Sequence, residues 1–308
     1  MIRIIEDNAA RGLAPASVVT IGNFDGLHLG HQALIRRCLE SRLPGEVTAV
    51  VTFEPLPQAF LRPQQAPPRI YGAQRKLDLL REAGVELAWV MRFDRELASM
   101  PAATFAESVL AAGLGARRVL VGPDFRFGHR REGDVPLLAN LGRRLGFVVE
   151  PADEVCLDGE RVSSTLIRKL LAAGNFARAE RCLGRPYVLR GQVIRGRQLG
   201  RELGYPTANL VPEATPCPLS GVFAVRARAT GDAQWLPAVA SLGVRPAVGG
   251  SEFLVEVHIF DFDGDLYQRE LEVWFIEKVR DEQDFPGMDE LVAQMKNDEQ
   301  RVRAILQA

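Results

Sequence analysis

The chain has 308 residues, of which 47% are hydrophobic and 25% are charged. These values are ordinary for a globular protein and exclude collagen-like, low-complexity and wholly disordered classes. Lys plus Arg number 38 and Asp plus Glu number 39, which gives a formal net charge of -1. No global positive field therefore attracts nucleic acid or an anionic membrane, and we expect neither as a partner.

The length predicts two domains, at roughly 150 residues each. The first part of the chain alternates β-branched apolar runs with amphipathic segments. The predicted strands are 18–21, 47–53, 86–91 and 117–121, and the predicted helices are 29–42, 73–83, 101–113 and 134–145. Regular strand–helix alternation is typical of an α/β fold with a parallel, doubly wound, Rossmann-like sheet. Residues 163–183 are also predicted to be helical, with Ser163 or Ser164 as an N-cap.

The pattern changes after Gly184-Arg185-Pro186 to short strands separated by Gly and Pro turns. The predicted strands are 187–194, 221–229, 253–260 and 266–276. Strands at this spacing favour a small antiparallel β-barrel or sandwich. A C-terminal helix is predicted over 288–306. We therefore expect one domain at 1–184 and a second at 185–308.

The chain lacks the features of a membrane or secreted protein. No apolar run approaches the ~18 residues of a membrane span, and acidic Glu6 and Asp7 follow the first residues directly, unlike a signal peptide. The four cysteines are far apart and form no C-x-x-C pair. This spacing argues against a disulfide framework or a zinc site, and a reduced, cytoplasmic location is expected.

One glycine- and histidine-containing segment, Gly22–His31, follows the first strand and opens the first helix. Ligands of doubly wound sheets bind at this edge, and the N–H groups of a helix N-terminus attract phosphate. His28 and His31 are three residues apart and therefore point the same way. A phosphate-binding loop is favoured over two surface histidines or a metal site with Asp25. No G-K-[ST] follows, so the segment is not a Walker A loop.

Two further segments are ambiguous when taken alone. Ser163, Ser164 and Thr165 stand before Arg168 at a predicted helix start, which suits either phosphate binding or plain N-capping. Residues 191–209 carry glycines at 196, 200 and 204 and arginines at 190, 195, 197 and 201. This pattern excludes a stable helix. It fits a flexible flap, an exposed hairpin loop or a weak RNA-contacting basic loop.

Together these motifs resemble a known family. G-N-F-D-G-L-H-L-G-H over 22–31 is similar to the HxGH nucleotidyltransferases and, in full, to the first module of bacterial bifunctional riboflavin kinase/FMN adenylyltransferases, also called FAD synthetases. Other similar segments follow in the family's order: Thr52–Pro55, Val121–Gly128, Arg161–Arg168, Gly204–Leu210, Leu254–His258 and Arg280–Gln283. The resemblance covers nearly the whole chain.

For the first module, the resemblance implies that FMN attacks the α-phosphate of ATP to give FAD and pyrophosphate. His28 and His31 would stabilise the developing charge, without a general base and without a covalent enzyme intermediate. ATP would be bound by Gly22, Asn23, Phe24, Asp25, Gly30, Ser163, Ser164, Thr165 and Arg168. The flavin would contact Asp124 and Phe125.

For the second module, the resemblance implies ATP-dependent phosphorylation of riboflavin to FMN. Glu256 would be the catalytic base, Thr207 and Asn209 would hold Mg²⁺, and Arg280 would bind flavin. ATP would be bound by Gly191, Gly196, Arg197, Gly204, Pro206, Thr207 and Asn209. The expected small-molecule partners are riboflavin, FMN and ATP. The oligomeric state is left open, a weak homo-oligomer included.

Three positions depart from the family's pattern. Leu56 stands where T-F-E-P-H-P has histidine, Pro123 replaces an acidic residue, and Ala247 replaces the threonine of R-P-T. Leu56 removes a polar contact, which keeps open a kinase with an impaired adenylyltransferase domain. The motifs are also compatible with a nucleotidyltransferase for another phosphorylated substrate, or with a flavin-binding regulatory or carrier protein.

An acidic run imitates a calcium loop without being one. Asp261, Asp263 and Asp265 are followed by Glu272 at the twelfth place. Leu266 occupies the sixth place, where an EF-hand needs glycine. Asp263-Gly264 is instead predicted to form a hairpin turn.

Overall fold

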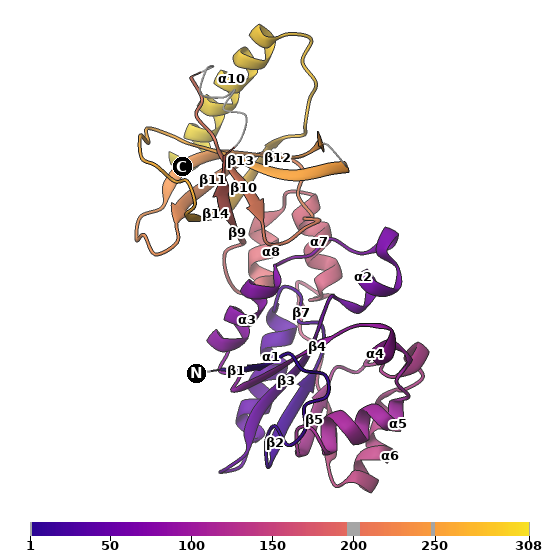
Figure 1. Ribbon diagram of the computed structural model, residues 1–308. Helices are drawn as coiled ribbons and strands as arrows, with labels where there is room; N and C mark the ends of the chain where they lie inside the picture. The colour runs from indigo at the N-terminus through magenta and orange to yellow at the C-terminus, as the bar shows by residue number, and fades with distance from the viewer. Residues whose placement is uncertain (1, 196–203, 248–249, 308) are drawn as a thin grey trace. The chain divides into compact units, whose positions relative to one another are not determined.

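The computed structural model describes residues 2–195, 204–247 and 250–307 (Figure 1). The chain forms two compact units. The first comprises Met1–Pro67 and Ala73–Ser163, and the second comprises Pro68–Gly72 and Ser164–Ala308.

The first unit is built on a six-stranded parallel sheet with the order β1-β4-β3-β2-β5-β6. Its strands are β1 (Arg3–Ile5), β2 (Ser17–Ile21), β3 (Val47–Glu54), β4 (Leu87–Arg92), β5 (Ala116–Val121) and β6 (Val148–Pro151). Every neighbouring pair is parallel. The strand order reverses between β2 and β5. This confirms the predicted doubly wound architecture and places its topological switch point at the carboxyl end of β2.

Helices cover both faces of this sheet. They are α1 (Leu29–Ser41), α2 (Pro57–Leu61), η1 (Pro63–Gln65), α3 (Ala73–Glu82), α4 (Arg95–Ser99), α5 (Ala102–Phe105), η2 (Ala106–Ala111), η3 (His129–Arg131) and α6 (Val135–Leu145). Successive strand residues point to opposite faces. Val18 therefore packs with Leu34 and Cys38 of α1. Val19, on the other face, joins the cluster formed with η2 and α6.

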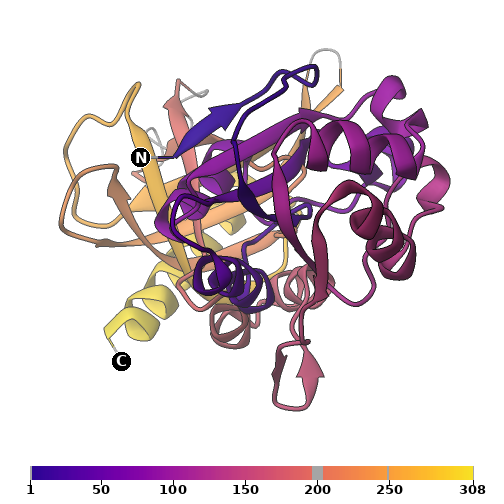
Figure 2. The same cartoon turned by 90° about the horizontal axis from the view of Figure 1, so that it is seen from below.

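Two predicted helices differ from the structure. The segment 101–113 begins as α5 but continues as the π-helical turn η2. The helical structure predicted over 163–183 is present but interrupted, because the chain forms α7 (Ser164–Ala172) and α8 (Phe176–Leu183). Gly174 has a φ of +72° between them, and the Asn175 side chain accepts a hydrogen bond from the Arg178 N–H and caps α8. A small ribbon, β7 (Cys156–Leu157) with β8 (Glu160–Arg161), projects from the first unit (Figure 2).

The second unit contains a closed antiparallel barrel with the order β10-β13-β12-β11-β14-β9, as predicted. Its strands are β9 (Val188–Ile194), β10 (Ala208–Pro212), β11 (Gly221–Ala229), β12 (Leu236–Ala247), β13 (Gly250–Ile259) and β14 (Glu270–Arg280). The C-terminal helix α10 (Met288–Gln307) packs on β11, β12 and β14. Val302 contributes to the small cluster that joins them.

The predicted turn at Asp263-Gly264 is wrong. β13 pairs with β10 and β12, whereas β14 pairs with β11 and β9. The segment 260–269 is therefore a crossover loop between strands that are not neighbours, and β14 begins at Glu270 rather than at 266. Asp261, the first acidic residue of the run that imitates a calcium loop, forms an ion pair with Arg303 of α10, with an Nη1–Oδ2 distance of 2.9 Å.

The two helices before the predicted boundary belong to the second unit, in which α7 contacts α8 and α8 packs on the barrel. The Phe176 ring of α8 lies 5.8 Å from that of Phe223 and 5.7 Å from that of Phe275, measured between centroids. Trp274 Nε1 donates to Glu180 Oε1 at 2.7 Å. Apart from the short segment Pro68–Gly72, the division between the compact units falls at 163/164, and the domain boundary at 184/185 stays a prediction.

Candidate functional site

The loop that carries the histidine motif leaves β2 at the switch point of the sheet. The β2–β3 pairing extends one step beyond the strand, because Gly22 N donates to Val51 O at 3.0 Å. The chain then turns tightly, with positive φ values of 49° at Phe24, 87° at Gly26 and 39° at Leu27. Phe24, Asp25 and Leu27 are buried. This turn places His28 at the N-terminus of α1.

His28 and His31 lie together there. Their rings stack with centroids 3.7 Å apart and planes 19° apart. His28 is the N-cap of α1, and its Nδ1 accepts from the His31 N–H at 3.4 Å. A Cβ on Gly30 would lie 3.2 Å from the His28 ring, so glycine permits this close arrangement. Two imidazoles at a helix N-terminus form an electropositive, hydrogen-bonding surface suited to phosphate.

The hydroxyl motif lies at the start of α7. Ser163 directly precedes this helix, Ser164 and Thr165 begin it, and Arg168 Nε donates to Pro68 O at 2.6 Å. Ser163 ends the first compact unit and Ser164 opens the second. Convergence of this motif and the histidine pair on one nucleotide therefore stays a prediction.

The predicted flavin contacts of the first unit follow β5. The Asp124 carboxylate is exposed and paired with Arg161, which also binds Glu154 Oε1 at 2.7 Å. These acidic partners, Asp124 foremost, raise the pKa of the Arg161 guanidinium. The Phe125 ring stacks on that of Phe127 with a centroid distance of 5.5 Å. Leu56 is only 4% exposed, so this departure from the family's pattern is an apolar packing residue.

The second site is centred on the β10–β13 pair. Asn209 lies directly opposite Glu256, and Glu256 lies opposite Ser241 on its other side. Directly opposed residues project to the same face of a sheet. Thr207 directly precedes β10, two residues before Asn209, and both residues line one cavity. Asn209 is buried and Glu256 is half-buried.

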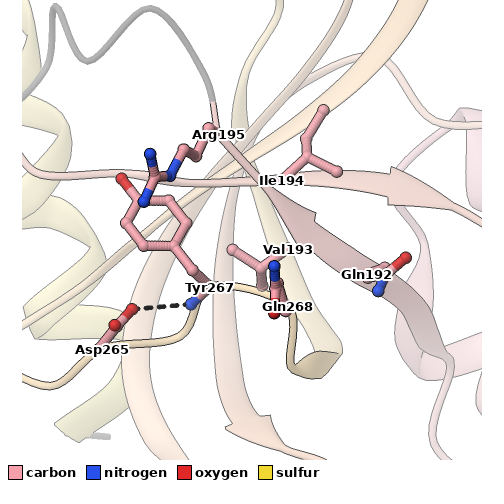
Figure 3. Close-up of a pocket in the computed structure, with 7 residues that line it drawn as sticks. All are labelled: Gln192, Val193, Ile194, Arg195, Asp265, Tyr267 and Gln268. Atoms are coloured by element: carbon pink, nitrogen blue, oxygen red, sulfur yellow. Dashed lines mark hydrogen bonds between the residues drawn. The ribbon is translucent and has the colours of Figure 1, made fainter.

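A cavity of about 540 Å³ adjoins Thr207 and Asn209 but is not lined by Glu256. Thr207 and Asn209 line one side, and Phe262, Asp263 and Tyr267 of the crossover loop line the other. A smaller cavity of about 460 Å³ lies beside Arg195, whose guanidinium carbon stands 5.4 Å from the centre of the Tyr267 ring (Figure 3). Both cavities are formed by β9 and the crossover loop, with β10 and β13 completing the larger one. The predicted ATP ligands Gly196 and Arg197 lie outside the described residues.

The segment before Thr207 is held by β13. His258 Nδ1 donates to Pro206 O at 2.8 Å, and its ring meets that of Tyr205 edge-on with centroids 5.3 Å apart. Burial first, and then the Glu299 carboxylate, raise the pKa of the Tyr205 hydroxyl. Gly204 has a φ of +82°, a conformation that suits glycine. Gly191 allows close strand packing, because a Cβ there would lie 2.7 Å from Val211 O.

Arg280, the predicted flavin residue of the barrel, is bound to α10. Its guanidinium forms an ion pair with the buried Asp298, with an Nη2–Oδ2 distance of 2.8 Å. Asp298 also accepts from Gln294 Nε2 at 2.8 Å. Sequence patterns missed Asp298, because an aspartate within an amphipathic helix is usually exposed. A Cβ on Gly243 would clash with Glu282, so the segment after Arg280 lies against β12, two residues from Ser241.

The donors fit the expected cation. In the described part of the chain, no cluster of three or more His, Cys, Asp or Glu side chains could hold a metal. Thr207 and Asn209 offer a hydroxyl and an amide oxygen, which are hard ligands of the kind that Mg²⁺ takes together with phosphate oxygens. None of the four cysteines, all in described segments, forms a disulfide. No helix in the described ranges is long and apolar enough to cross a membrane.

Comparisons with known proteins agree with this arrangement. The family model for FAD synthetase matches residues 11–166 and that for riboflavin kinase matches residues 183–306. The bifunctional riboflavin kinase/FMN adenylyltransferase of Pseudomonas fluorescens is 44% identical over 94% of this chain and 92% of its own length. The enzyme of the same name from Escherichia coli K12 is 40% identical over 96% of this chain and 95% of its own.

A solved structure matches both units as well. It is described as a macrolide-efflux protein from Streptococcus pneumoniae, is 32% identical, covers 98% of each chain and has a TM-score of 0.82. Its description concerns efflux, whereas both family models and both curated relatives concern flavin enzymes. The match to both family models, in order and over most of the chain, shows that this chain belongs to the family of bifunctional riboflavin kinase/FMN adenylyltransferases.

Proposed function

We propose that this chain converts riboflavin to FMN in its barrel and FMN to FAD at its histidine site, using ATP in both steps. The observation that carries the proposal is that the histidine pair and the Asn209–Glu256 pair lie in different compact units. The stacked His28 and His31 are in the first, and the opposed Asn209 and Glu256 are in the second.

In the kinase step, a neutral ribityl hydroxyl attacks the γ-phosphate of ATP. Glu256 is positioned on the same face as Asn209 and accepts the hydroxyl proton. Thr207 and Asn209 hold Mg²⁺, which offsets the charge between the phosphates when it is bound. Gly191, Gly204 and Pro206 shape the backbone around ATP, and Arg280 serves the flavin side.

In the adenylyltransferase step, the attacking FMN phosphate is already an anion and needs no base. Its rate depends on bringing two polyanions together and on stabilising the charge that accumulates at the α-phosphate. His28, His31, the N–H groups of α1 and Arg168 supply that stabilisation. Asp124 and Phe125 contact the flavin.

A kinase with an impaired adenylyltransferase domain is the second candidate, and the observation behind it is Leu56. One experiment separates the two. The full-length protein is incubated with riboflavin, ATP and Mg²⁺, and the flavins are separated by chromatography over time. We expect FMN first, then FAD with one pyrophosphate per FAD, and neither product with EDTA. FMN that accumulates without FAD would support the kinase-only candidate. Cytoplasmic location stays a prediction.

A further inference from the structure

A buried lysine in the first unit has no part in the motifs described so far. Lys76 lies on α3 and is 2% exposed. Burial of an ammonium group is costly unless hydrogen-bond acceptors replace the lost water. The adjacent Arg75 instead forms an ion pair with the exposed Glu82, with an Nη1–Oε1 distance of 2.8 Å. Lys76 therefore serves a structural or functional need that its neighbour on the same helix does not.

The Lys76 ammonium contacts three acceptors at the carboxyl end of β3. Nζ lies 2.6 Å from Glu54 Oε1. It lies 3.1 Å from Thr52 Oγ1 and 3.3 Å from Phe53 O. An ammonium group has three protons and no acceptor, so it can donate to all three groups at once. These acceptors belong to the Thr52–Pro55 segment that resembles the family's pattern.

Thr52 links Lys76 to the loop Gly22–Asp25, which is predicted to bind ATP. Thr52 is fully buried, and its Oγ1 donates to Asn23 O at 3.2 Å. Because Lys76 can only donate, it occupies a lone pair of the hydroxyl and leaves the hydroxyl proton for Asn23. The β2–β3 ladder ends with Gly22 N and Val51 O. The Thr52 hydroxyl thus holds the chain one residue beyond that ladder, where the loop turns toward His28.

We propose that Lys76 is a positioning residue of the adenylyltransferase site. Its ammonium orients the Thr52 hydroxyl, which holds the Asn23 carbonyl and with it the loop Gly22–Asp25. The proposal rests on the proposed FMN adenylyltransferase function. It assigns Lys76 no contact with substrate. Loss of the charge should loosen the ATP-binding loop, raising KM for ATP more than it lowers kcat.

The test uses full-length protein with FMN, ATP and Mg²⁺ and measures kcat and KM for FAD formation. Lys76→Met keeps the length of the side chain and removes its charge, and Thr52→Val removes the hydroxyl with little change of shape. Each should lower kcat/KM for ATP by about tenfold to a hundredfold, the range for loss of a hydrogen bond to a charged group. Thr52→Ser should restore most of the rate. Combining Lys76→Met with Thr52→Val should cost little more than either alone, because the two act in one relay.

Two controls make the outcome specific. Arg75→Met alters the adjacent residue of α3 and should leave the rate unchanged. Riboflavin phosphorylation by the same variants should also be unchanged, because its residues lie in the other compact unit. If Lys76→Met does not fold, the comparison of Thr52→Val with Thr52→Ser decides alone. Equal losses in those two, or no loss in Lys76→Met, would overturn the positioning role only. Wild-type protein that makes no FAD would overturn the proposed function as well.

Discussion

Asn209 and Glu256 face each other directly across the β10–β13 pair, and Glu256 faces Ser241 across the next pair. Three adjacent strands thus bring an amide, a carboxylate and a hydroxyl into one row on one face of the barrel. The row needs no special loop conformation, because the register of an antiparallel sheet fixes it. A base candidate is therefore held by rigid strands rather than by a mobile segment.

The substitution Glu256→Gln should stop the kinase step and leave the adenylyltransferase step unchanged. The amide keeps the size of the side chain but accepts no proton, so riboflavin phosphorylation should fall by roughly 10²- to 10⁴-fold. FAD formation from supplied FMN should be unchanged. Initial rates with riboflavin or FMN as the substrate check both statements. The exposed Glu277→Gln on β14 is the matched control and should retain both rates; loss of the kinase step there would contradict a specific role.

Substitution of either stacked histidine should slow the adenylyltransferase step and leave the kinase step unchanged. His28→Ala or His31→Ala removes a donor at the developing charge, and FAD formation should fall by roughly 10²- to 10³-fold. Riboflavin phosphorylation should continue, so FMN accumulates. Chromatography of the flavins measures this directly. His129→Ala is the matched histidine control in the same unit. A trapped adenylyl-histidine would contradict the mechanism without a covalent intermediate.

Substitution Thr207→Val should change the magnesium dependence of the kinase step. The valine keeps the shape but removes one hard oxygen ligand, so the Mg²⁺ concentration for half-maximal rate should rise by about tenfold or more. Titration of Mg²⁺ at constant ATP gives the value. Thr207→Ser, which returns the hydroxyl, should recover most of the affinity. A similar Mg²⁺ titration for all three proteins would exclude Thr207 as a ligand.

The pair between Arg280 and Asp298 should stabilise the second unit. Asp298→Asn leaves a largely buried guanidinium without its anion, and such losses cost about 3 kcal/mol or more. The unfolding transition of the barrel in urea should shift to lower concentration. Asp289→Asn, on the exposed first turn of α10, should leave it in place. An unchanged unfolding transition in Asp298→Asn would contradict a stabilising role for the Arg280–Asp298 pair and would favour a role of Arg280 in flavin binding alone.

The cysteines should differ sharply in reactivity. Burial raises the pKa of the Cys38 and Cys217 thiols to about 12, whereas Cys156 is exposed. A higher pKa means less of the reactive thiolate, about one part in 10⁴ near pH 8. A thiol reagent should therefore modify Cys156 rapidly and the three buried cysteines only after denaturation. Cys156→Ser should abolish the fast phase; a remaining fast phase would contradict the burial of the others.

Local patterns predicted the elements that depend on nearby residues. The apolar runs that became β2 to β5, the helix start at His28 and the change of pattern after Gly184 all depend on nearest-neighbour preferences and periodicity. The helical pattern predicted over 163–183 did not reveal the break at Gly174-Asn175, where a left-handed glycine and an N-cap separate two helices. β1 and β6 have three and four residues and are too short for a periodic signal.

Long-range pairing accounts for the remaining differences. Asp263-Gly264 has the composition of a hairpin turn, yet its two flanking strands pair with other partners. A two-residue period says which face a residue occupies but not which strand is its neighbour. Lys76 and Asp298 were missed for a related reason. Both have the side chains of surface residues, and only the folded partners Glu54 and Arg280 reveal that they are inside.

The five residues Pro68–Gly72 are counted with the barrel, although the chain before and after them folds with the sheet. Arg69 N donates to Pro216 O at 2.9 Å, and Tyr187 Oη donates to Ile70 O at 3.2 Å. The backbone of this five-residue segment, here called the strap, is therefore hydrogen-bonded to the second unit. The polypeptide consequently passes from one unit to the other three times. Gene fission at 163/164 would deprive the kinase half of that strap, so the two activities cannot be parted cleanly by one cut.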